Sequence, residues 1–182
     1  MKEKLLRVCY EGTSVLVIAT VIIAIMFTFF VRFISVVGDS MNDTLASGNW
    51  VIVSEMNLNY EPNYGDIVII SQPNTMNENL IKRVIATEGQ QVNINFQTGA
   101  VFIDGHEIIE SYISTPTTNY YDISFPITVP AGYCFVMGDN RQNSVDSRSS
   151  VVGLIDNRYV LGNAVYAITS DGFKNLDLRA SN

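Results

Sequence analysis

The chain has 182 residues, of which 47% are hydrophobic, and its formal net charge is −7. An acidic chain of this kind is not expected to bind nucleic acid, because phosphate backbones require a basic face. Its 2 cysteines and 1 histidine offer no ligand set for a metal ion, and we predict neither a metal nor a cofactor.

The first predicted element is an uncleaved membrane anchor. The segment from Thr13 to Val31 contains no charged residue. As a helix at ~1.5 Å per residue it would extend roughly 29 Å, the thickness of the hydrocarbon core of a bilayer. It continues directly into Arg32 and lacks the small-residue cleavage site that ends a secretory signal peptide. Basic residues precede the segment at positions 2, 4 and 7, whereas after Arg32 none follows before Lys82. The positive-inside rule therefore places the N-terminus in the cytoplasm.

This orientation predicts a single-pass protein of the cell membrane with two parts. Residues 1–32 form the cytoplasmic N-terminus and the anchor, which contacts membrane lipid. Residues 33–182 form one extracytoplasmic domain, long enough to have its own core. We expect that core over about 33–92 and 129–170, with a smaller β insertion over about 93–128.

After the anchor, the sequence predicts mostly β-strands. Short runs rich in β-branched and aromatic residues, bounded by Gly, Pro, Asn and Asp, are typical of strands. They are Ile34–Val37, Asn49–Ser54, Ile67–Ile70, Leu80–Ile85, the hairpin Val92–Phe96 with Ala100–Ile103, Ala131–Met137 and Arg158–Ile168. Between 111 and 128 the chain is rich in Thr, Tyr, Ser and Pro, which predicts an irregular excursion.

Ser40 is the candidate nucleophile, because it lies between small and polar neighbours soon after the anchor. A serine hydroxyl is a weak nucleophile at neutral pH, so this interpretation requires a base. His106 follows the tight-turn pair Asp104-Gly105 and is expected to be exposed, which disfavours a histidine-based triad. Lys82 lies in the apolar run Leu80–Ile85 instead. Burial there would lower the lysine pKa by the ~2 units from ~10.4 that a base working near pH 8 needs.

Four motifs resemble, in order, the successive boxes of type I signal peptidases. They are G-D-S-M-N-D-T-L, Y-G-D-I-V-I-I, I-K-R-V-I-A-T-E-G and M-G-D-N-R-Q-N-S-V-D-S-R. The resemblance, which runs from the anchor to about Ile155, is to enzymes of the Gram-positive type. It implies a membrane serine protease with an antiparallel, barrel-like β-sheet domain. Such an enzyme removes signal peptides from exported precursor proteins after small residues.

The same resemblance implies roles for individual residues. Ser40 and Lys82 form the catalytic dyad, and the main-chain N–H of Ser40 supplies one oxyanion donor. Ser144 hydrogen-bonds and orients the lysine amine, while Asp146 and Arg148 form a supporting ion pair. Substrate-binding residues are expected on both sides of the dyad, at Val36, Gly38, Met41, Leu80 and Ile81. Gly38 stands where many relatives carry a hydroxyl.

Two departures from the family pattern predict a specialised enzyme. Asp43 stands where relatives usually carry proline, and Ala86-Thr87-Glu88-Gly89 replaces a G-L-P-G-like turn. A narrower set of clients, such as subunits of a surface appendage or pilus, would fit these changes. Two alternatives remain open: a non-enzymatic, signal-peptidase-like assembly chaperone for pilus subunits, and a LexA-like Ser/Lys autoprotease. The retained dyad favours an enzyme over the chaperone, and the anchor disfavours the autoprotease.

Overall fold

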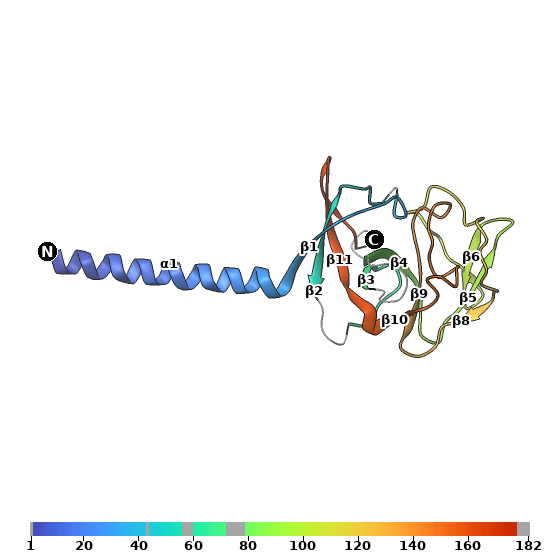
Figure 1. Ribbon diagram of the computed structural model, residues 1–182, viewed down its shortest axis with the longest axis horizontal. Helices are drawn as coiled ribbons and strands as arrows, with labels where there is room; N and C mark the ends of the chain where they lie inside the picture. Colours follow the sequence, from blue (N-terminus) through green and yellow to red (C-terminus); the bar gives the residue numbers. More distant parts are fainter. Residues whose placement is uncertain (1, 43, 56–59, 72–78, 178–182) are drawn as a thin grey trace.

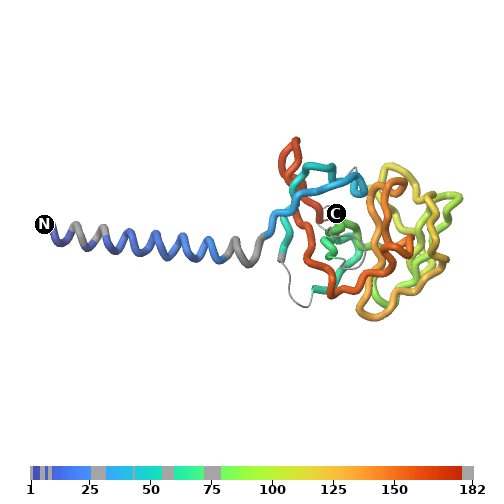
Figure 2. The backbone as a smooth tube through the Cα atoms, viewed as in Figure 1, coloured from blue at the N-terminus to red at the C-terminus, as the bar shows by residue number. Residues whose placement is uncertain are grey.

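A computed structural model describes residues 2–42, 44–55, 60–71 and 79–177. It begins with helix α1 (Lys2–Phe30), which leads directly into strand β1 (Val31–Ser35). Figures 1 and 2 show α1 extending away from the rest of the chain. Among the described residues, no helix combines the length and the apolar character needed to cross a membrane. The anchor predicted over residues 13–31 stays a prediction.

Most of the β-strands form one antiparallel sheet of eight strands. Seven lie in the order β1-β2-β11-β3-β4-β9-β10, and β12 pairs with β11. Beyond β1, their bounds are β2 (Trp50–Glu55), β3 (Ile67–Ser71), β4 (Asn79–Thr87), β9 (Tyr133–Met137), β10 (Ile155–Asp156), β11 (Val160–Thr169) and β12 (Gly172–Asn175). A short 3₁₀-helix, η1 (Asn157–Tyr159), precedes β11 at a place where the sequence predicts strand. The mostly β, antiparallel fold expected from the sequence is confirmed.

A second antiparallel sheet lies beside β9 (Figure 1). Its four strands, in the order β7-β6-β5-β8, are β5 (Gln91–Asn95), β6 (Ala100–Ile103), β7 (His106–Glu107) and β8 (Ile127–Thr128). The β5–β6 pair is the hairpin that the sequence predicts, with Val92 opposite Ile103. Apolar side chains of β5 and β6 pack with those of β4 and β9 in one core cluster. Between β7 and β8, residues 108–126 form no helix or strand.

Strand β4 is central in the large sheet and supplies the candidate base. It is hydrogen-bonded to β3 on one side and to β9 on the other. Positions 81–86 are all buried, because both faces of the sheet are covered here. Side chains alternate between the two faces of a strand, so Lys82 and Arg83 point in opposite directions. This alternation separates the two cations into different environments.

Candidate active site

Ser40 lies in the turn that connects β1 with β2. After β1 the chain stays extended through the buried Val36, whose main chain is hydrogen-bonded to the segment that leads into β2. Gly38 then turns the backbone with a φ of 86°, a conformation that side chains other than hydrogen rarely allow. Past the serine, Met41 and Leu45 are buried in the core. The loop is thus fixed on both sides of Ser40 by buried apolar residues.

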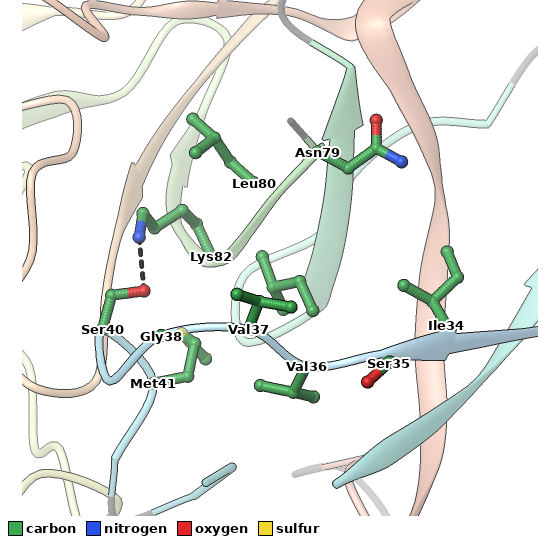
Figure 3. A pocket seen from close by; sticks show the side chains of 11 residues that line it. Ile34, Ser35, Val36, Val37, Gly38, Ser40, Met41, Asn79, Leu80 and Lys82 are labelled. Carbon is green, nitrogen blue, oxygen red and sulfur yellow. Dashed lines mark hydrogen bonds between the residues drawn. The ribbon is translucent and has the colours of Figure 1, made fainter. Parts of the chain in front are cut away.

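Lys82 reaches this loop from β4. Its Nζ atom donates a hydrogen bond of 2.7 Å to Oγ of Ser40 (Figure 3). The Lys82 residue is only 3% exposed. Burial lowers the pKa of its ammonium from 10.5 to about 8, although the carboxylate of Asp146 acts in the opposite direction. The lysine is therefore poised to exchange a proton with the serine in the mildly alkaline range.

A cavity of about 340 Å³ opens beside the two side chains. One wall is the extended chain from the end of β1 to the serine loop, and the other is the start of β4 (Figure 3). The lining residues are Ile34, Ser35, Val36, Val37, Gly38, Ser40, Met41, Asn79, Leu80, Ile81 and Lys82. They include all five residues expected to bind substrate. The cavity has room for short side chains flanked by an extended peptide.

Asp146 is the centre of a buried polar cluster behind the lysine. Its carboxylate forms a bidentate pair with Arg148, with distances of 2.8 Å from both Nε to Oδ1 and Nη2 to Oδ2. Both side chains are fully buried. The main-chain N–H of Gly138 donates to the same carboxylate at 3.0 Å. Because both oxygens of this buried carboxylate have hydrogen-bond donors, the ion pair is held in one geometry.

The contact of Ser144 differs from the sequence-based expectation. Its hydroxyl donates to Oδ2 of Asp146 at 2.8 Å, and no hydrogen bond joins it to Lys82 among the described side chains. The physical reason is that the ionised carboxylate of Asp146 is a strong acceptor within reach of the Ser144 hydroxyl, while Nζ of Lys82 donates to Ser40 instead. Ser144 therefore belongs to the Asp146 cluster in this state.

Two further buried ion pairs were not predicted. Arg83 pairs with Asp139 through Nε at 2.8 Å and Nη2 at 2.6 Å, and Arg141 pairs with Glu110. Tyr112 lies under both guanidinium groups, 4.0 Å from Cζ of Arg83 and 5.9 Å from Cζ of Arg141. Burial, together with Glu110, raises the pKa of this tyrosine well above its usual range. The charged residues of the M-G-D-N-R motif indicated that ion pairs could form here. The sequence did not show that Arg83 and Glu110 are the partners.

The loop after β9 touches the serine loop main chain to main chain. A Cβ atom built on Gly138 would lie 2.4 Å from the carbonyl oxygen of Ser40 and 2.3 Å from Oγ of Ser144. Only glycine permits this approach. A larger residue at position 138 would have to displace the backbone of Ser40 and the side chain of Ser144. The close approach brings the M-G-D-N-R motif directly against the candidate nucleophile.

The other residues considered from the sequence do not contribute to this site in the described part of the chain. His106 is on β7 in the second sheet, is exposed, and contacts the carbonyl oxygen of Asp104 at 3.1 Å. Within the described ranges, no group of three His, Cys, Asp or Glu side chains could hold a metal ion. Asp43 lies outside the described residues. The arrangement at the site therefore combines a hydroxyl, a buried amine hydrogen-bonded to it and an adjacent cavity, with no histidine beside them.

Comparison with known proteins identifies the family. Residues 9–169 match the family described as signal peptidase, peptidase S26. The chain is 35% identical to a probable signal peptidase I-1 of Synechocystis, over 86% of this chain and 80% of that protein. It is 32% identical to a signal peptidase I of Bacillus licheniformis, over 86% and 87% of the two chains. A solved signal peptidase I from Enterococcus faecalis is 27% identical, covering 57% of this chain and 97% of that one with a TM-score of 0.47. The family match and the curated relatives establish that the chain belongs to the signal peptidase family, peptidase S26, and is a serine endopeptidase.

Proposed function

We propose that this endopeptidase removes signal peptides from exported precursor proteins, with Ser40 as nucleophile and Lys82 as general base. The observation that carries the proposal is the 2.7 Å contact between Nζ of Lys82 and Oγ of Ser40. A buried amine with a pKa of about 8 is an effective base for a hydroxyl, whereas an exposed lysine is almost fully protonated at neutral pH.

The reaction proceeds in two steps through an acyl-enzyme. Neutral Lys82 takes the hydroxyl proton of Ser40 as Oγ attacks the scissile carbonyl carbon, and the main-chain N–H of Ser40 donates to the oxyanion that forms. The ammonium then gives its proton to the leaving amine, and the C–N bond breaks. In the second step, Lys82 takes a proton from water, and the hydroxide releases the signal peptide as a carboxylic acid while Oγ regains its hydrogen.

The lining of the cavity supports a preference for small residues near the cut. Val36, Met41, Leu80 and Ile81 line it with apolar surface, and Gly38 removes side-chain bulk from the same wall. An apolar wall gains free energy from burying a methyl group against it. A substrate with small residues near the cut therefore fits best.

The buried cluster behind Lys82 serves as its support. In the proposal, Asp146 and Arg148 hold Ser144 and the loop after β9 in place, and this loop in turn fixes the serine. Arg148 lowers the pKa of Lys82 and Asp146 raises it, so the two effects oppose each other. Burial is therefore the main cause of the lowered pKa. The ion pair therefore has a structural role, whereas Ser40 and Lys82 take part in the reaction.

We further propose that residues 1–32 anchor the chain in the cell membrane and that 33–182 act outside the cytoplasm as one catalytic domain. The support is the uncharged run from Thr13 to Val31 and the basic residues before it. An N-terminus in the cytoplasm places Ser40 just beyond the membrane, where signal peptides of exported precursors end.

A narrower client range completes the proposal. Asp43 follows Ser40 by three positions in the sequence, and its negative charge disfavours the oxyanion that forms on the scissile carbonyl. Ala86–Gly89 also departs from the family turn. These features support slow cleavage of general precursors and selection of a smaller group, such as pilus subunits.

The proposal is tested by precursor cleavage with the full chain in detergent. Ser40→Ala is expected to fold and to lose cleavage, because it removes only the nucleophilic oxygen. Ser47→Ala is the matched control, since Ser47 is exposed in the same connection between β1 and β2, and it should cleave like the wild type. Cleavage by Ser40→Ala would show that the nucleophile lies elsewhere.

A further inference from the structure

Asn140 holds both peptide groups that flank the nucleophile. Its side-chain Nδ2 donates to the carbonyl oxygen of Asp39 at 3.0 Å, and its main-chain N–H donates to the carbonyl oxygen of Ser40 at 3.0 Å. We propose that Asn140 is a positioning residue that aims the main-chain N–H of Ser40 at the developing oxyanion. This inference rests on the proposed function of Ser40.

The geometry of the peptide unit links the hydrogen bond at Asp39 to the direction of the Ser40 N–H. The carbonyl of Asp39 and the N–H of Ser40 belong to one planar, trans unit, so they point in opposite directions. With the oxygen fixed toward Asn140, the N–H must point away from it. Among the described residues, no acceptor is hydrogen-bonded to this N–H, and Ser40 itself lines the cavity. The donor is therefore open to a substrate oxygen.

The hydrogen bond to Asp39 also strengthens the donor. A peptide whose carbonyl accepts a hydrogen bond is polarised and donates more strongly through its N–H. This matters here because position 38 is a glycine, which brings no hydroxyl to the oxyanion. The main-chain donor of Ser40 has to carry a larger share of the stabilisation.

Asn140 is itself held rigidly. It lies between Asp139, which is paired with Arg83, and Arg141, which is paired with Glu110. Nε of Arg141 additionally donates to the carbonyl oxygen of Gly138 at 3.1 Å. Because Asn140 is fixed between two buried ion pairs, the Ser40 N–H that it orients needs no rearrangement when the oxyanion forms, which is the condition for efficient electrostatic stabilisation. The ion pairs that the sequence did not reveal thus acquire a role in catalysis through Asn140.

The test compares transition-state binding with ground-state binding. Asn140→Ala and Asn140→Leu both remove the side-chain donor without adding charge, and leucine keeps the branching of asparagine at Cγ. We expect kcat to fall about tenfold or more, with KM unchanged within about twofold. A peptide aldehyde, which forms a hemiacetal oxyanion on Ser40, should lose affinity by the same factor as kcat. An uncleavable peptide of the same sequence should bind as before.

Gln142→Ala is the matched control. Its amide, two residues further along the same loop, donates to Pro116 at 2.8 Å and to Thr118 at 2.9 Å, and not to the serine loop. It should keep both kcat and aldehyde affinity. The inference is overturned if Asn140→Ala and Asn140→Leu cleave as fast as Gln142→Ala, or if aldehyde and uncleavable peptide lose affinity equally. Cleavage by Ser40→Ala would instead overturn the proposed nucleophile.

Discussion

The carbonyl oxygen of Ser40 lies 2.4 Å from the position that a Cβ atom would occupy on Gly138. The candidate nucleophile therefore lies against main chain that is 98 positions away in the sequence, counted from 40 to 138. The main-chain N–H of Asn140 also donates to this carbonyl oxygen at 3.0 Å, so the loop after β9 and the loop after β1 are joined.

Gly138→Ala should disable the enzyme. The added methyl group must displace the backbone of Ser40 or the side chain of Ser144, which we expect to cost about 1–3 kcal/mol of stability. A shift of about 1 Å at the nucleophile should lower kcat by about 10²-fold. Asn143→Ala, an exposed position in the same loop, is the control for thermal unfolding and precursor cleavage. Normal activity of Gly138→Ala would show that the close approach is dispensable.

Lys82 should set the pH dependence of cleavage. Because the neutral amine is the active form, the rate should rise with pH through an apparent pKa of about 8. Lys82→Arg and Lys82→Met should both lose activity by a factor of about 10²–10⁴, since arginine stays protonated and methionine cannot accept a proton. The measurement is kcat/KM between pH 6 and 10. An acidic limb near the histidine pKa of ~6.5 that disappears in His106→Ala would contradict the assignment.

The buried lysine should also be visible in stability. Its folded-state pKa of about 8 lies below the ordinary 10.5, so between these values the unfolded chain binds more protons than the folded chain. The free energy of unfolding should therefore rise with pH through this window, by about 3 kcal/mol in total. Lys82→Met should lack this rise. Denaturant unfolding of both proteins at pH 7, 9 and 10.5 measures the difference, and identical slopes would argue against a desolvated ammonium.

The orientation in the membrane can be read with reporters. An alkaline phosphatase domain fused after Asn182 should be active, because that enzyme matures outside the cytoplasm. A cytoplasmic reporter at the same position should be inactive. The opposite pattern would place residues 33–182 inside the cell and exclude exported precursors as substrates.

Client selectivity is tested at Asp43, a position outside the described residues. Asp43→Pro removes a negative charge and fixes φ in the segment after the nucleophile, so cleavage of a general precursor should become faster. Asp43→Asn separates the two effects by removing the charge alone. Rapid cleavage by the wild type, with no gain from either change, would identify an unspecialised peptidase.

Much of the fold and the burial of Lys82 followed from local pattern. Alternating or continuous apolar runs predicted most strands and the β5–β6 hairpin, because strand formation depends on residues within a few positions of each other. The same locality applies to Lys82, whose apolar neighbours indicated burial and a lowered pKa. The predicted strand began at Arg158, but Arg158 and Tyr159 lie in η1, because their composition also fits a turn.

Only the tertiary structure decided how the site is supported. Arg83 and Asp139 are 56 positions apart, and Arg141 and Glu110 are 31 apart, so neither pairing leaves a trace in a short window of sequence. The partner of Ser144 also depended on which groups lie near its hydroxyl in space. The sequence by itself determined which groups could react, since hydroxyl, amine and apolar surroundings are properties of residues and their neighbours. Their distances and their fixed orientation come from long-range packing of β1, β4 and the loop after β9, which no local pattern encodes.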